Sequence, residues 1–179
     1  MRVRTIIAAA MFSFALALVG CSDPQPKEPD GPTATPTQVA PTLPEAATED
    51  SEEGAVAFVK HYIALLNYAS DTGDVERLRE ASDPKCVGCN SYIELYESTY
   101  ANGGYFKAPG WMATDLEAAT SGETHEIWLD IDARAGVYRV DAMTPEKRAV
   151  RDTYKLFLSV KRDSSGWLIA EFARQDPSQ

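Results

Sequence analysis

The sequence contains three cysteines, Cys21, Cys86 and Cys89, and their types and spacing are its clearest indication of chemistry. Two residues separate Cys86 from Cys89, a spacing that suits a short disulfide, a redox dithiol or half of a zinc site. A structural zinc ion takes four ligands, and His61 and His125 are the only histidines that could complete such a set. The zinc interpretation is therefore the weakest of the three.

The surroundings of the cysteine pair favour a structural disulfide. The pair follows the helix-breaking step Asp83-Pro84 and opens a helix that we expect to run to Tyr100, whereas a redox dithiol usually follows a strand of a βαβ unit. In an oxidising compartment the two thiols should pair, and so short a loop contributes about 2 kcal/mol. The redox alternative stays open, because Cys89 would lie near a helix N-terminus, which lowers a thiol pKa.

The third cysteine follows a segment with the properties of a signal peptide. Arg2 and Arg4 form a short positive region, and residues 5–19 are mostly apolar. A transmembrane helix needs about 20 apolar residues, so this run is short for one that spans a bilayer. Polar residues begin directly after Cys21, so we expect residues 1–20 to be removed on export.

The four residues Leu18-Val19-Gly20-Cys21 resemble the lipobox of bacterial lipoproteins. The resemblance implies that the Cys21 thiol is diacylated and becomes the new N-terminus, and two acyl chains make membrane anchoring stable. We therefore expect a protein held on the extracytoplasmic face of the cell membrane by a diacylglyceryl anchor. The alternative is an ordinary signal peptide that ends near an incidental cysteine.

Charge and composition divide the mature chain into a linker and one domain. Without residues 1–20 it has 15 basic and 27 acidic residues, which argues against nucleic-acid binding and against a polybasic membrane patch. Residues 21–53 hold seven of the eleven prolines and no aromatic residue, so we expect a disordered linker there. Its threonines are also candidates for O-linked sugars. Residues 54–179 then form a single globular domain.

Hydrophobic periodicity predicts that this domain is α+β. Three helices should be followed by four or five mostly antiparallel strands, with the helices packed on a curved sheet. The expected helices cover residues 52–70, 75–81 and 86–100. The expected strands cover residues 111–120, 124–132, 136–143, 153–160 and 166–173.

This order of elements resembles the nuclear-transport-factor-2-like, or cystatin-like, cone fold. Three stretches are also similar to an uncharacterised family of actinobacterial lipoproteins with a domain of unknown function: residues 58–89, GWMATDLEA and GWLIAEFA. The block from Ser82 to Cys89 is the most specific part of the match. The resemblance implies a fold and a location, and it implies no catalytic residue.

Cone folds often enclose a pocket between sheet and helices, and some related enzymes place an acid or a base in it. Strand parity places His125 on the same side as Ile127 and Leu129. Candidate inward polar groups also include Glu117 and Asp130. The candidate pocket residues are Tyr96, Asp115, His125, Trp128 and Tyr138.

None of these side chains has a spacing that demands catalysis, and no serine elbow, phosphate loop or metal-binding run is present in the sequence. We therefore expect a non-catalytic domain that binds a small ligand or a protein, without cofactor or metal, and by analogy with cone folds a homodimer. The alternative is a small pocket enzyme, an isomerase or hydrolase, with His125 or an aspartate as its base.

Overall fold

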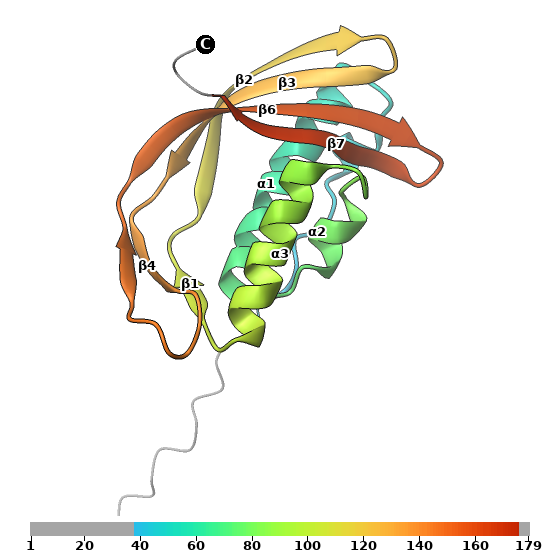
Figure 1. Ribbon diagram of the computed structural model, residues 1–179. Helices are drawn as coiled ribbons and strands as arrows, with labels where there is room; N and C mark the ends of the chain where they lie inside the picture. The colour runs from blue at the N-terminus through green and yellow to red at the C-terminus, as the bar shows by residue number, and fades with distance from the viewer. Residues whose placement is uncertain (1–37, 176–179) are drawn as a thin grey trace, which may run out of the picture. The chain divides into compact units, whose positions relative to one another are not determined.

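The computed structural model describes residues 38–175, and Figure 1 shows helices lying against one face of a curved array of strands. A short 3-10 helix, η1 (Glu45–Thr48), precedes the three helices. The helices are α1 (Glu52–Thr72), α2 (Glu76–Glu80) and α3 (Val87–Ala101). The strands are β1 (Tyr105–Lys107), β2 (Trp111–Ser121), β3 (Thr124–Ala133), β4 (Gly136–Arg139), β5 (Lys147–Ala149), β6 (Asp152–Asp163) and β7 (Gly166–Gln175).

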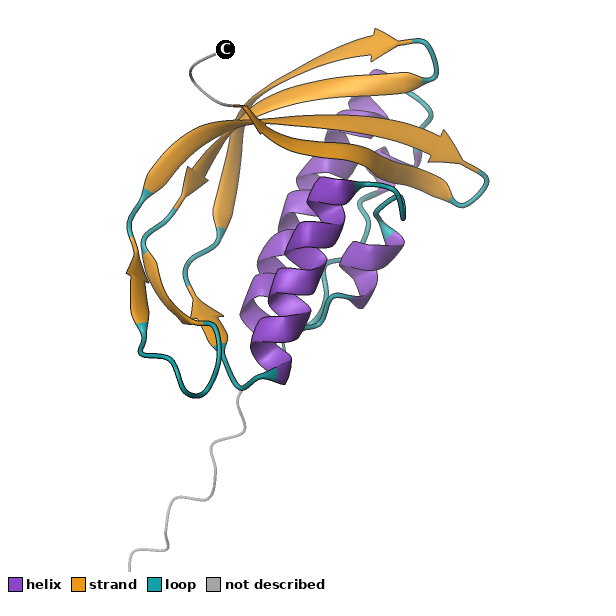
Figure 2. Cartoon of the chain, viewed as in Figure 1, coloured by secondary structure: helices purple, strands orange, loops and turns teal. Residues whose placement is uncertain are grey.

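The strands form two antiparallel sheets (Figure 2). The larger sheet has the order β2-β3-β6-β7, and the smaller has the order β1-β4-β5. The α+β prediction is confirmed, as are the three helices. The prediction of a single sheet of four or five strands is wrong. It missed β1 and β5 because these strands have three residues each and are too short to show a period in the sequence.

Local signals set the ends of α1. The Ser51 side chain accepts a hydrogen bond from the Gly54 N–H, and Glu52 and Glu53 lie at the positive end of the helix dipole. Gly73 ends the helix in the left-handed conformation, with φ 78°. Gly54 is also required for packing, because a Cβ on it would lie 2.1 Å from the Glu49 carbonyl oxygen.

The core lies between α1 and the face of the larger sheet that we call the inner face. Ile127, Leu129 and Ile131 of β3 project from this face and are completely buried. Register places Leu158 and Leu156 of β6 directly opposite Ile127 and Leu129. The alternation predicted from the sequence therefore decides which face of each strand meets the helices.

The folded region begins earlier than the expected boundary between residues 53 and 54. Ala47 of η1 belongs to the buried core, and the Trp167 indole N–H donates to the Glu49 carbonyl. The Arg162 guanidinium likewise donates to the Thr48 carbonyl. Residues 38–53 are therefore part of the domain, because Arg162 and Trp167 of the β6–β7 hairpin form hydrogen bonds with the backbone of this segment.

The predictions for residues 1–37, which include the leader, Cys21 and most of the linker, concern residues outside the described part of the chain. Within residues 38–175, no helix combines the length and hydrophobicity needed to cross a membrane.

Candidate functional site

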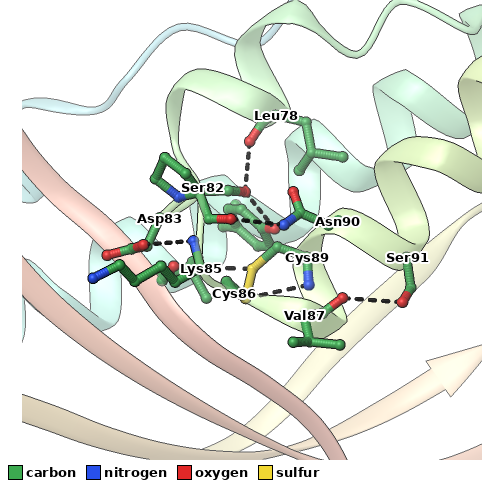
Figure 3. Close-up of a disulfide and its surroundings, with 12 residues drawn as sticks. Leu78, Ser82, Asp83, Lys85, Cys86, Val87, Cys89, Asn90 and Ser91 are labelled. Atoms are coloured by element: carbon green, nitrogen blue, oxygen red, sulfur yellow. Dashed lines mark hydrogen bonds between the residues drawn. A yellow bond between two sulfur atoms is a disulfide. The ribbon is translucent and has the colours of Figure 1, made fainter.

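Cys86 and Cys89 form a disulfide at the start of α3, as Figure 3 shows. Cys86 is the N-cap residue, and its sulfur accepts a hydrogen bond from the Cys89 N–H at 3.2 Å. The two residues are only 1% and 0% exposed. Burial shields both sulfur atoms from an external thiolate, so the geometry favours the structural disulfide over the redox dithiol.

The segment that leads into the disulfide is fixed to β7. Asp83 donates its N–H to the Ile169 carbonyl, and Ile169 donates its N–H to the Ala81 carbonyl. The Asp83 carboxylate forms an ion pair with Lys161 of β6, and this partner holds the pKa of the carboxyl below its ordinary value. The block from Ser82 to Cys89 therefore attaches the helices to the far edge of the larger sheet.

Aromatic side chains fill the space between the inner face and the helices. Tyr92 of α3 is central, with ring centroids 5.3 Å from those of both Trp111 and Phe172 and 6.1 Å from that of Tyr96. The Trp111 ring also meets Tyr154 of β6 edge to face, at 5.8 Å. These contacts place an aromatic cluster where an interior ligand pocket would otherwise lie.

The titratable groups in this cluster are tyrosines. Burial raises the pKa of Tyr92, Tyr96 and Tyr154 above the ordinary value for tyrosine. Their hydroxyl groups therefore stay protonated at neutral pH, which suits packing and hydrogen bonding rather than proton abstraction.

A hollow of about 820 Å³ lies on the larger sheet, and most of its lining residues project from the opposite, outer face. They include Thr114, Trp128, Asp130, Thr153 and Lys155. Trp128 packs on Phe157 of the neighbouring strand, with centroids 5.5 Å apart. The hollow therefore presents one half-buried aromatic surface surrounded by polar side chains.

The charges around the hollow are paired. Lys155 Nζ lies 2.8 Å from Asp130 Oδ1, and Arg174 lies 3.1 Å from Asp152. The Arg151 guanidinium donates to both carboxylate oxygens of Asp132 at 2.8 Å, and this lowers the Asp132 pKa from its ordinary value. Such a surface suits a polar ligand of low net charge or a protein segment.

The five candidate pocket residues do not converge on one site. Tyr96 and Tyr138 are linked through Phe106, which meets the first edge to face and stacks on the second. Asp115 is exposed on a bulge of β2, with φ 50°. Trp128 lines the hollow on the outer face.

His125 lies on the inner face near the β6–β7 hairpin, as its strand parity predicts. Its ring meets Trp167 edge to face at 5.4 Å, and its Nδ1 lies 3.1 Å from the Thr120 hydroxyl. Asp130 and Glu117, the two other polar residues expected to face inward, both lie on the outer face. Register pairs Glu117 with Trp128 and Asp130 with Thr114.

A family model matches residues 32–172 of this chain. The chain belongs to the DUF6318 family. The function of that family is unknown, so membership assigns no reaction and no ligand. No curated protein matches this DUF6318 sequence.

Solved structures with low sequence identity share the fold of this DUF6318 protein. The intermembrane space region of the chloroplast protein ARC6 is 17% identical, with a TM-score of 0.52 over 70% of this chain and 97% of its own. The Kfla4162 protein from Kribbella flavida is 12% identical, with a TM-score of 0.52 over 72% of this chain and 95% of its own.

A nuclear transport factor 2-like superfamily protein from Salmonella enterica is also similar. It is 12% identical, with a TM-score of 0.46 over 68% of this chain and 89% of its own. The likenesses to the ARC6 region and to Kfla4162 concern the fold alone, so any functional statement depends on the side chains of this chain.

Sequence reasoning missed Lys155 and Thr153 as members of the hollow. Strand alternation places Thr153, Lys155 and Phe157 on one face of β6, and that signal is present in the sequence. Which residues of β3 they meet depends on the register Trp128↔Phe157 and Asp130↔Lys155, which only the assembled sheet reveals.

Proposed function

We propose that this protein is a bacterial lipoprotein, anchored through Cys21 on the extracytoplasmic face of the cell membrane, whose cone-like domain is a non-catalytic binding module. The binding site in this proposal is the hollow around Trp128. A small polar ligand or a protein segment would rest on the indole, and Asp130 and Lys155 would offer an acceptor and a donor at its margin.

One observation carries this proposal: aromatic side chains pack between the inner face and the helices, while a recessed polar surface lies around Trp128. A pocket enzyme of the isomerase or hydrolase type would need a desolvated acid or base beside an enclosed space. His125 lies against Trp167 and Thr120 instead, and the buried titratable groups near the centre are tyrosines. Binding therefore has more support than catalysis.

The binding part is tested by purifying the exported mature protein from its native host and recording native and denatured mass spectra. We expect a ligand or partner mass in the native spectrum that disappears on denaturation. Trp128→Ala should lose that mass, whereas Leu95→Ala, an exposed apolar residue on α3, should keep it. A native mass equal to that of the polypeptide plus lipid, or an adduct unchanged by Trp128→Ala, would contradict the proposed site.

The anchor is tested separately by fractionation. Cys21→Ser should move the protein out of the membrane fraction, whereas Ser22→Ala, at the next position, should leave it there. Unchanged membrane retention of Cys21→Ser would overturn the lipoprotein assignment without affecting the binding experiment.

A further inference from the structure

The smaller sheet carries a charge opposite to that of the rest of the domain. Its strands and connecting segments, residues 105–107 and 134–151, contain six basic and two acidic residues. The remainder of residues 38–175 contains eight basic and 21 acidic residues. The acid excess of the whole chain, which argues against a polybasic patch, is therefore an average over two regions of opposite sign.

Register places the basic residues around an aromatic ring on one face of this sheet. Tyr105 pairs with Arg139, Lys107 pairs with Val137, and Val137 pairs with Arg148, so these five side chains share a face. The Lys107 ammonium and the Arg139 guanidinium lie 4.4 Å and 5.0 Å from the Tyr105 ring centroid. We call this set the basic face.

The other side of the small sheet is turned toward the helices. Phe106 lies between Tyr105 and Lys107 in β1, so its side chain projects from the opposite face of the sheet. Its ring centroid lies 5.4 Å from that of Tyr96 of α3. Tyr138 stacks on Phe106 at 5.9 Å. The basic face is therefore directed away from the core, and Lys107 and Arg148 are exposed on it.

The cations of the basic face have no carboxylate partner within residues 38–175. None of the ion pairs formed there includes Lys107, Arg139 or Arg148. Of the two acidic residues of the region, Asp141 accepts backbone N–H groups of its own loop. Glu146 lies beside the basic face, where its carboxylate accepts the Tyr105 hydroxyl. Arg139 is half-buried and donates to the Gly103 carbonyl, so Lys107 and Arg148 are the cations of this face that are available to an external anion.

A shallow hollow and exposed apolar side chains accompany these charges. The hollow measures about 480 Å³ and is lined by Lys107, Val137, Arg148 and Val150, among others. Val150 is 80% exposed, and Met143 in the loop between β4 and β5 is 93% exposed. Cationic side chains next to exposed apolar ones suit the boundary between lipid headgroups and acyl chains.

The described chain also begins at the end of the domain that carries this sheet. The first described residue, Gln38, lies near Asp71 in the last turn of α1. The Tyr100 hydroxyl near the end of α3 donates to the Ser70 carbonyl, and β1 starts shortly after that helix. Figure 1 shows β1 and β4 beside these ends of α1 and α3.

From these observations we propose that the basic face binds the phosphate headgroups of anionic phospholipids and orients the domain on the membrane. The inference rests on the proposed function in one respect, since the Cys21 anchor would bring the domain to the bilayer. The acidic remainder of the domain is repelled by the same surface, so the preferred orientation places the small sheet toward the lipid.

The test uses the chain from residue 21 with Cys21→Ser, so that acylation plays no part. Its co-sedimentation is compared between vesicles of phosphatidylcholine and vesicles of equimolar phosphatidylcholine and phosphatidylglycerol. We expect binding to the anionic vesicles that weakens as salt is raised. Each cation near an anionic surface strengthens partitioning about five-fold, so Lys107→Ala with Arg148→Ala should lower it about 25-fold.

Two variants control this experiment. Lys60→Ala with Arg77→Ala removes the same two residue types from exposed positions on α1 and α2, and should bind like the parent chain. Lys107→Arg with Arg148→Lys keeps both charges and should retain binding. Equal binding to both vesicle types, or a Lys107→Ala/Arg148→Ala variant that binds like its parent, would overturn the proposal.

A binding assay with a soluble anionic polymer distinguishes a membrane surface from the other candidate partner of the basic face, an anionic polymer. Binding to polyphosphate without binding to vesicles would assign the basic face to anionic polymers and overturn the membrane proposal. None of these results depends on whether Cys21 is acylated or on whether Trp128 binds a ligand, so failure here leaves the proposed function intact.

Discussion

The hydroxyl groups of Tyr62 and Ser82 lie 2.9 Å apart in the interior of the domain. Ser82 also donates its single hydroxyl proton to the Leu78 carbonyl at 2.8 Å. Tyr62 must therefore be the donor to Ser82. This chain of two hydrogen bonds joins α1 to the end of α2 at the start of the segment that leads into the disulfide.

Tyr62→Phe removes one donor from this chain and keeps the ring. We expect a loss of about 1 kcal/mol in the free energy of unfolding, measured by urea denaturation. Ser82→Ala should cost more, about 1–3 kcal/mol, because the buried Tyr62 hydroxyl loses its acceptor. Tyr68→Phe, which removes the hydroxyl of a half-buried tyrosine of the same helix from its bond to Asp74, is the control. A greater loss for Tyr62→Phe than for Ser82→Ala would refute the assigned direction of the bond.

Gly88 allows α3 to approach β7 closely. A Cβ on Gly88 would lie 2.0 Å from the Phe172 carbonyl oxygen, which belongs to the backbone and cannot turn aside. Gly88→Ala should therefore lower the free energy of unfolding by about 2 kcal/mol or more. Val87→Ala, at an exposed neighbouring position, should change it by less than about 0.5 kcal/mol. Similar thermal midpoints for both variants would argue against this close approach.

The Cys86–Cys89 disulfide should resist reduction while the domain is folded. Both residues are buried, so a reductant should act only when the domain opens. Alkylation followed by mass spectrometry should detect free thiols after reduction in urea and few without it. Cys86→Ala with Cys89→Ala should lower the free energy of unfolding by about 2 kcal/mol. Rapid reduction of the folded protein would favour the redox interpretation instead.

The Asp83–Lys161 pair predicts a loss of stability in acid. The partner lowers the pKa of Asp83 in the folded state, so the pair stabilises the fold fully above the unfolded pKa of about 4. This stabilisation is lost as the pH falls below that value toward the folded pKa. The difference in urea midpoint between the parent and Asp83→Asn should therefore be largest near neutral pH and shrink toward pH values of about 3.

Glu94→Gln, on the exposed side of α3, controls for the general effect of removing one negative charge. A difference between the parent and Asp83→Asn that stays constant over the same pH range would show that the ion pair is not its cause.

Asp115 occupies the left-handed region on the bulge of β2, with φ 50°. A β-branched residue is strained there by about 1–2 kcal/mol, so Asp115→Val should destabilise the domain by about that amount. Asp115→Gly should stay within about 0.5 kcal/mol of the parent, because glycine adopts this conformation readily but loses more entropy on folding. Glu117→Val, on the same strand beyond the bulge, should have little effect. Equal losses for the two valine variants would argue against strain at Asp115.

Much of the larger sheet and its helices could be predicted because their signals are local. Ser51 and Gly73 mark the ends of α1, and the Asp163 side chain accepts the Ser165 N–H in the β6–β7 turn. The alternation of Ile127, Leu129 and Ile131 also identified the inner face correctly. Of the small sheet, only β4 was predicted, within the expected strand 136–143. Its partners β1 and β5 were missed because each has three residues, and β1 pairs with β4 from about thirty residues away.

The candidate site was predicted only in part, for the same reason. Trp128 was named as a pocket residue, but its neighbours Thr114 and Lys155 lie on other strands and are fixed by register. The bulge between Thr114 and Glu117 shifts that register, and nothing in the local sequence specifies where it falls. Tyr96 and Tyr138 were expected beside Trp128 and instead belong to the aromatic contacts around Phe106.

The sequence by itself determined where the helices and the long strands begin and end to within a few residues, and which face of each long strand is apolar. It also determined that Cys86 and Cys89 can pair, because caps, periodicity and loop length act over a few residues. The tertiary structure alone decided which side chains meet. Strand register placed Lys155 beside Trp128, and the pairing of three short strands gathered Lys107, Arg139 and Arg148 on one face of an acidic protein. Such contacts join residues far apart in the chain, so their positions follow from packing and not from any local pattern.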